Sequence, residues 1–104
     1  MTARGDVWLV NLDRGPGDVA TGHCLIVSPA ELHDVLDVVL VAPVVTGRRP
    51  ATFRAEVRFN NERARILLDQ VTALDKGRLI RRLGALEPDD LSAALAILRD
   101  MFAE

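Results

Sequence analysis

The pattern that most limits the fold of this chain runs through residues 53–69. Hydrophobic and polar side chains alternate strictly over residues 53–59, and after Asn60 and Asn61 they alternate again over residues 63–69, except at Leu67. A period of two residues predicts strands buried on one face, and the two asparagines supply a turn. The inward residues are Phe53, Ala55, Val57, Phe59, Ala64, Ile66 and Leu68. The fold therefore contains an antiparallel hairpin.

Other short segments predict further strands around this hairpin. Continuous apolar runs at residues 6–12, 24–27 and 38–45 predict strands buried on both faces, and residues 79–86 predict another strand. Between the first two strands, residues 13–22 hold three glycines and a proline, which predicts a long flexible loop.

Two helical segments complete the pattern. Ser28, Pro29 and Glu31 have capping-box spacing, which predicts a short helical turn from residue 29 to about residue 35. Pro88 opens a second helix, which has one apolar stripe. The stripe consists of Leu91, Ala94, Leu95, Leu98 and Phe102. Antiparallel strands followed by one C-terminal helix predict an α+β fold built on a small curled sheet or barrel.

Composition limits the class of protein. The 104 residues are 49% hydrophobic and 27% charged, which predicts one globular domain over residues 1–104. Cys24 is the single cysteine, so the chain forms no internal disulfide and no cysteine-based zinc site. We expect no metal or other cofactor. The run at residues 38–45 is too short to span a membrane, and the first residues do not resemble a signal peptide, so we expect a cytoplasmic protein.

Charge is unevenly distributed along the chain. Residues 48–82 hold ten basic and four acidic side chains, whereas the remainder holds three basic and eleven acidic ones. The polar face of the hairpin is predicted to collect Arg54, Arg58, Arg63 and Arg65. Two interpretations stay open: the arginines form a patch for an anionic partner, or they form an ordinary solvated face.

Several ordered segments resemble the MazF/PemK (Kid-like) toxin family. They are residues 4–13 (RGDVWLVNLD), 24–29 (CLIVSP), 41–43 (VAP), 67–70 (LLDQ), 75–76 (DK) and 82–84 (RLG). The resemblance covers almost the whole chain. It implies a small SH3-like, CcdB-type antiparallel β-barrel with a short connector helix and a C-terminal helix. It also implies a homodimer, neutralisation by a cognate antitoxin, DNA contact only through that antitoxin, and metal-independent cleavage of single-stranded RNA.

The sequence departs from the family at both catalytic positions. The family's arginine after the first loop is replaced by Gly22, and its threonine after the Ala-Pro segment is replaced by Val45. Cleavage through the 2′-hydroxyl of RNA requires a base, an acid and positive charge for the phosphorane. His23 beside Gly22 is the candidate base or acid, Thr46 offers a hydroxyl, and Arg48 offers charge. The alternative for His23 is a structural hydrogen-bonded residue.

The remaining candidates are for binding. RNA or antitoxin contacts are predicted at Arg49, Arg54, Arg58, Arg63, Arg65 and Gln70, although Gln70 is equally suited to a structural role. His33 is predicted at the surface, Cys24 in the core, and Trp8 in the core or a dimer interface. The antitoxin segment that covers the arginines is expected to be acidic and partly apolar.

Three functions compete. The first is the endoribonuclease toxin of a type II module, with shifted or weakened catalytic groups. The second is a protein of the same fold that binds antitoxin or RNA without cleaving, which the loss of both catalytic positions favours. The third is a gyrase poison of the CcdB kind, which ranks last because the chain ends without the tryptophan-containing segment of that family.

Overall fold

The computed structural model describes residues 2–12, 20–45 and 54–103, and the side chain of Arg54 is left out of the description. Residues 13–19 of the loop predicted over residues 13–22, together with Thr46, Arg48, Arg49 and Phe53, lie outside these residues. The last two residues of that predicted loop, Thr21 and Gly22, instead begin strand β2. The strands are β1 (Asp6–Asn11), β2 (Thr21–Ile26), β3 (Val38–Val45), β4 (Arg54–Phe59), β5 (Glu62–Leu67), β6 (Thr72–Asp75) and β7 (Leu79–Ala85). The helices are α1 (Ala30–His33) and α2 (Pro88–Phe102), with 3-10 turns η1 (Leu68–Gln70) and η2 (Lys76–Arg78).

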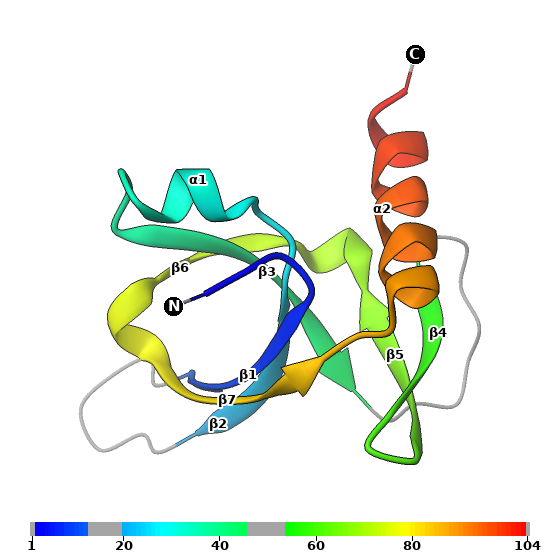
Figure 1. Cartoon of the computed structure of the whole chain (residues 1–104), viewed down its shortest axis with the longest axis horizontal. Helices are drawn as coiled ribbons and strands as arrows, with labels where there is room; N and C mark the ends of the chain where they lie inside the picture. The colour runs from blue at the N-terminus through cyan, green and yellow to red at the C-terminus, as the bar shows by residue number, and fades with distance from the viewer. Residues whose placement is uncertain (1, 13–19, 46–53, 104) are drawn as a thin grey trace.

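All strand pairs are antiparallel, in the order β4-β5-β3-β2-β1-β7, with β6 on the first half of β3. Strand β3 therefore has β6 beside residues 38–41 and β5 beside residues 44–45. Figure 1 shows β1, β2, β3, β6 and β7 curling around one centre, while the β4–β5 hairpin and α2 lie beside them. The predicted α+β fold on a curled antiparallel sheet is confirmed.

The hairpin predicted from alternation forms at β4 and β5. Asn60 and Asn61 both have positive φ, of 50° and 64°, as a two-residue turn matched to the twist of a hairpin requires. Ala55, Val57, Ala64 and Ile66 are buried on its inner face. The return strand ends two residues earlier than predicted, because residues 68–70 tighten into η1, which leads into β6.

The sheet separates two clusters of buried side chains. One cluster is formed by Val10, Cys24, Ile26, Val39 and Val41, with Trp8, Leu74 and Leu79 against it. The other lies on the opposite side of the central strands, where Val7, Leu25, Ala42 and Ile66 pack with Ala94 of α2. Burial on both sides explains the continuous apolar runs of β1, β2 and β3.

The helix α2 begins at Pro88 as predicted, but its packed stripe differs from the predicted one. Leu91, Ile97, Leu98 and Met101 contact the core beside buried Ala94. Phe102, predicted to face the core, is 79% exposed, because the last turn of α2 extends past the sheet. No helix among the described residues has the length and apolar character needed to cross a membrane.

The predicted capping box does not form. No side chain caps α1, which covers only residues 30–33. The Ser28 hydroxyl instead accepts a hydrogen bond from the Leu40 backbone N–H at 3.0 Å and shares another with His33 Nε2 at 2.6 Å. Ser28 therefore joins the connection after β2 to strand β3 rather than starting the helix.

Candidate functional site

A pocket of about 420 Å3 opens where β2 begins, β3 ends and the β4–β5 hairpin turns. Its walls are formed by Thr21, Gly22, His23, Val44, Val45, Phe59, Asn60, Glu62 and Ala64. Both positions at which the resemblance expects a catalytic group, Gly22 and Val45, thus lie in the wall of one pocket. His23 lies there as well, so the structure brings the sequence candidate together with the two altered positions.

The position of His23 follows from the pairing of β2. His23 lies opposite Leu9 of β1 and Val44 of β3, and directly opposite residues of an antiparallel pair share a face. Two residues further along, Leu25 is fully buried on that face, whereas His23 is exposed at the end of the strand. The imidazole is therefore presented to solvent at the rim of a rigid sheet.

Gly22 has a packing role that the sequence did not indicate. A Cβ atom at Gly22 would lie 2.7 Å from Leu12 Cδ1, so the Leu12 side chain occupies the space that a larger residue would need. Restoring an arginine here would require Leu12 to move. The absence of a side chain at Gly22 is therefore matched to the position of Leu12 in this chain.

Glu62 is a pocket residue that sequence reasoning did not select. It follows the Asn60–Asn61 turn and lies opposite Phe59. The Phe59 ring packs on the backbone of β7, since a Cβ at Gly84 would lie 3.1 Å from Phe59 Cζ. One signal was available in the sequence. Every second residue of a strand points to the same face, so Glu62 follows the inward residues 64, 66 and 68 and places a carboxylate at the end of that face.

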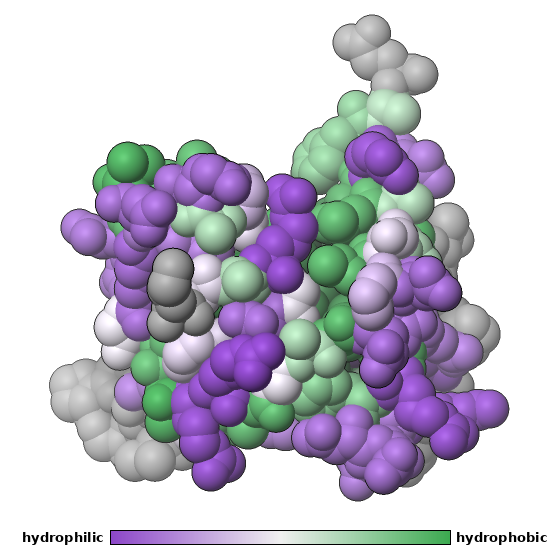
Figure 2. Space-filling model, in the orientation of Figure 1, coloured by the Kyte–Doolittle hydropathy of each residue, from purple (hydrophilic) through white to green (hydrophobic). Residues whose placement is uncertain are grey.

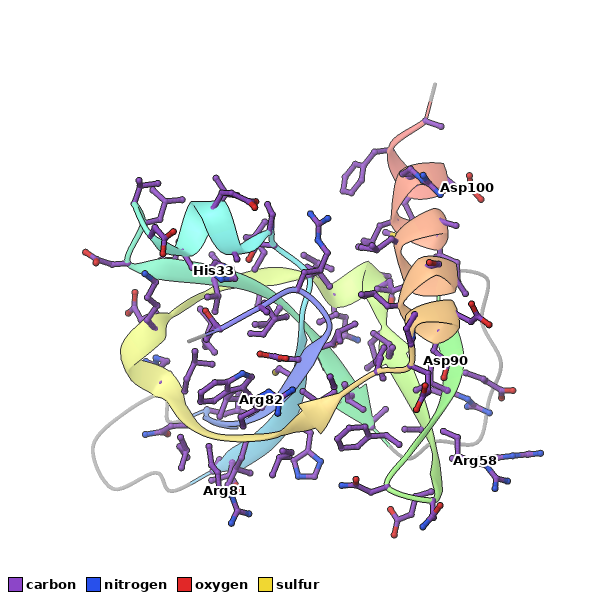
Figure 3. The ribbon with its side chains drawn as sticks, in the orientation of Figure 1. His33, Arg58, Arg81, Arg82, Asp90 and Asp100 are labelled. Carbon is purple, nitrogen blue, oxygen red and sulfur yellow. The ribbon has the colours of Figure 1, made fainter. Side chains whose placement is uncertain are left out.

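The arginines of the hairpin are only partly the predicted surface patch. Arg58 and Arg63 lie directly opposite each other and are exposed, and Arg58 points away from the hairpin in Figure 3. Two like charges in opposite positions destabilise a sheet unless an anion neutralises them, which favours an anionic partner. Figure 2 shows the surface around this hairpin as hydrophilic.

Arg65, predicted on the exposed face, is buried. Its side chain is only 10% exposed, and its Nη2 atom pairs with Glu56 Oε1 at 3.3 Å across the two strands. Its Nε atom has no hydrogen-bond partner among the described residues. Together with Glu56, Arg58, Arg63 and Asp90, Arg65 lines a second pocket of about 320 Å3. Arg65 therefore lines the wall of this pocket and is not part of the exposed arginine surface.

Two further arginines have separate roles on β7. Arg81 lies opposite Leu9, which itself lies opposite His23, so the register places Arg81 and His23 on one face, two strands apart. Arg82 Nε forms an ion pair with buried Asp6 at 3.2 Å. Gln70 is exposed in η1 and lines neither pocket.

His33, predicted at the surface, is buried beneath α1 (Figure 3). Ser28 Oγ accepts the Leu40 N–H and shares a hydrogen bond with His33 Nε2 at 2.6 Å. The Nδ1 atom of His33 shares another with Thr2 Oγ1 at 2.9 Å, and Lys76 Nζ donates to the His33 carbonyl oxygen. His33 is a structural residue at the opposite side of the barrel from His23.

Among the described residues, no group of three His, Cys, Asp or Glu side chains is placed to hold a metal ion. The buried cysteine has a different environment from a reactive thiol. Burial raises the pKa of the Cys24 thiol from 9.0 to about 11. Cys24 therefore acts as a small core residue, as predicted.

This pKa shift predicts how stability depends on pH. Above pH 9 the unfolded thiol loses its proton while the folded one keeps it, so the free energy of unfolding falls on the order of 2 kcal/mol between pH 9 and pH 11. Urea denaturation at pH 8, 9, 10 and 11 measures this loss. In Cys24→Ala the thiol contribution disappears, and an equal slope in both proteins would contradict the assignment.

Comparisons with known proteins agree with this architecture. The family model described as the PemK-like, MazF-like toxin of type II toxin-antitoxin systems matches residues 3–102. No curated protein sequence matches the chain.

Several solved structures have the same fold. A mycobacterial endoribonuclease in complex with its cognate antitoxin superposes with a TM-score of 0.82 at 21% identity, covering 96% of this chain and 93% of the other. A MazE-MazF complex from Deinococcus radiodurans gives 0.79 at 21%, covering 99% and 95%. The Mycobacterium tuberculosis toxin MazF-mt6 gives 0.77 at 20%, covering 93% and 95%. At such identities the likeness establishes the fold.

Proposed function

The chain belongs to the PemK-like, MazF-like toxin family of type II toxin-antitoxin systems, and on that premise we propose that it is a toxin that cleaves single-stranded RNA without a metal ion. The observation that carries the proposal is the match of the family model to residues 3–102. The pocket at the ends of β2 and β3 supports it, because an exposed imidazole lies there beside both altered positions.

In this proposal His23 transfers a proton during attack of the RNA 2′-hydroxyl on the adjacent phosphate. Thr46 follows Val45 directly in the chain and supplies a hydroxyl, and Arg48 supplies positive charge to the phosphorane. Arg49, Arg54, Arg58 and Arg63 bind the RNA backbone or the antitoxin, with Gln70 as a further polar contact. Arg65, which is buried and paired with Glu56, is not part of this surface. The cytoplasm, which holds RNA and keeps an unpaired thiol such as Cys24 reduced, is the proposed location.

The test is direct. The purified, antitoxin-free protein is incubated with a long natural RNA in EDTA, and the new 5′ ends are mapped by primer extension. Cuts at defined positions are expected. Absence of cuts from folded protein would contradict the endoribonuclease proposal.

The second candidate function is binding without cleavage. It is favoured by Gly22 and Val45 at the two catalytic positions and by the Leu12 side chain that fills the space beside Gly22. In that case the same RNA would bind to the arginine surface and remain intact, so the cleavage assay combined with a binding assay separates the two candidates.

RNA binding is expected to depend on Arg58 and Arg63. The binding constant of a uridine oligonucleotide is measured in EDTA at several salt concentrations, and its logarithm is plotted against the logarithm of the salt concentration. In the double variant Arg58→Gln/Arg63→Gln, the slope of this plot is expected to become shallower by about 1.4, because each phosphate contact to a single strand contributes about 0.7. Arg99→Gln on exposed α2 is the matched control. An unchanged slope in the double variant would show that these two arginines do not contact the RNA backbone.

The protein is proposed to be a homodimer that is neutralised by an antitoxin with an acidic, partly apolar segment. Apolar side chains stand exposed at Leu32, Val35, Leu36 and Leu40, around α1 and the start of β3, and Figure 2 shows apolar surface over α1. Sedimentation at micromolar concentration is expected to give about twice the 11.4 kDa of one chain. A single species near 11.4 kDa would contradict the dimer. An antitoxin whose toxin-binding segment is basic would contradict the proposal of an acidic antitoxin.

A further inference from the structure

The pocket at the ends of β2 and β3 holds two ionisable side chains among its described lining residues, and they come from different parts of the chain. His23 belongs to β2, and Glu62 begins β5 directly after the hairpin turn. The other lining residues are apolar or neutral. The pocket therefore pairs one imidazole with one carboxyl group, with no further ionisable described group in its wall.

The sheet places both side chains on one face. His23 lies opposite Val44, and Val44 lies opposite Ile66, so these three residues share a face. Glu62 is four residues before Ile66 along β5 and has the same parity, which puts it on that face too. The register therefore places both side chains on one face of the sheet, and both line the same pocket.

The hairpin also restricts where Glu62 can go. Asn60 and Asn61 hold the two left-handed positions of a tight turn, and Glu62 lies opposite Phe59 in the last strand pair. Phe59 is held in turn against Gly84 of β7. The hairpin tip is therefore held to the sheet that carries His23 through Phe59, and the backbone of Glu62 is held by its pairing with Phe59.

We propose that Glu62 is a catalytic residue that forms a general base and general acid couple with His23, a proposal that rests on the proposed ribonuclease function. The Glu62 carboxylate takes the proton of the RNA 2′-hydroxyl as that oxygen attacks the phosphorus. The bond from phosphorus to the 5′-oxygen breaks, and the His23 imidazolium gives its proton to the departing 5′-oxygen. The products are a 2′,3′-cyclic phosphate and a 5′-hydroxyl, and exchange of one proton with water at each residue restores the couple.

The direction of transfer follows from the chemistry of the two groups. A carboxylate can take the proton of the 2′-hydroxyl as a base, and an imidazolium can give its proton to the departing 5′-oxygen as an acid. The couple also accounts for cleavage in a protein that has neither the arginine nor the threonine of its family.

The experiment compares Glu62→Gln with the wild-type protein on a single-stranded RNA substrate in EDTA between pH 4 and pH 9. Glu62→Gln keeps the shape of the side chain at an exposed position, so the fold is retained, and Glu31→Gln on exposed α1 is the matched control. We expect the wild-type rate to rise and then fall with pH. In Glu62→Gln the rate falls at least about 100-fold and the rise at acidic pH disappears. Glu62→Asp is expected to recover part of the rate.

Binding of a 2′-deoxy version of the substrate, which lacks the attacking hydroxyl, is measured alongside and is expected to be the same in both proteins. If the wild-type protein cleaves while Glu62→Gln retains its rate and its pH profile, the couple is refuted and the ribonuclease function stands. If Glu62→Gln loses binding of the 2′-deoxy substrate in proportion to its rate, Glu62 is a binding residue and the catalytic proposal is overturned. If the wild-type protein leaves the RNA intact, the proposed function fails and the couple fails with it.

Discussion

Replacement of His23 by asparagine is expected to lower the rate of RNA cleavage in EDTA by a factor of about 10² to 10⁴, the range that positioned acid or base groups contribute. The imidazole is exposed at the start of β2 and lines the pocket that Gly22 and Val45 also line. Asparagine can still form hydrogen bonds but cannot exchange a proton near neutral pH. The measurement is the initial rate of cleavage of one mapped site.

The same variant is expected to fold as the wild-type protein does. No hydrogen bond of a buried group depends on the exposed His23 side chain among the described residues, so its melting temperature is expected to change by no more than about 2 °C. Cleavage at the wild-type rate by the asparagine variant would assign His23 to the structural role instead. If the asparagine variant loses both its fold and its activity, His23 is likewise assigned to the structural role.

Replacement of His33 by alanine is expected to give the opposite result, a less stable protein with an intact pocket. The two ring nitrogens of His33 form hydrogen bonds with the hydroxyls of Ser28 and Thr2. Alanine removes both bonds, takes one partner from the Ser28 hydroxyl, and opens space beneath α1. A buried polar group that loses its partner costs 1–3 kcal/mol, so with the lost packing we expect a total of about 3 kcal/mol.

Thermal and urea denaturation measure this loss, which corresponds to a fall of about 15 °C in melting temperature for a domain of this size. Glu31→Ala on the exposed side of α1 is the control, with an expected change within about 0.5 kcal/mol. At a temperature where His33→Ala remains folded, its cleavage rate is expected to equal that of the wild-type protein. A stable variant without activity would mean that the roles of the two histidines are reversed.

The two histidines show where local sequence patterns stop being informative. Their local patterns differ, since His23 precedes an apolar strand and His33 lies in a predicted helical turn, but neither pattern indicates which imidazole is buried. His33 is buried because Thr2, Ser28 and Lys76 approach it from three other segments. His23 is exposed because β2 continues beyond the core. Burial of a single side chain depends on contacts between distant segments, which periodicity does not encode.

The arginines illustrate the same limit. Alternation assigned Arg58, Arg63 and Arg65 correctly to the outer face of the hairpin, but the face of a strand does not determine exposure. Arg65 is covered and paired with Glu56, whereas Arg58 and Arg63 nearer the turn remain exposed. Phe102 is the converse case, since it lies near the apolar stripe of α2 but beyond the end of the sheet that would cover it.

The sequence by itself determined the elements whose signals are local. These are the hairpin around Asn60 and Asn61, the core strands buried on both faces, the helix that begins at Pro88, and, through motifs along almost the whole chain, the toxin family. Each of these depends on the spacing of residues that are neighbours along the chain.

Only the tertiary structure decided which residues share a pocket. Glu62 reaches the rim where His23 lies because β3 stands between β2 and β5 in one register, and because Phe59 holds the hairpin against Gly84. A shift of one residue in any of these strand pairs would turn one of the two side chains to the other face of the sheet. Register is fixed by the packing of the whole curled sheet, so the candidate site exists only in the folded chain.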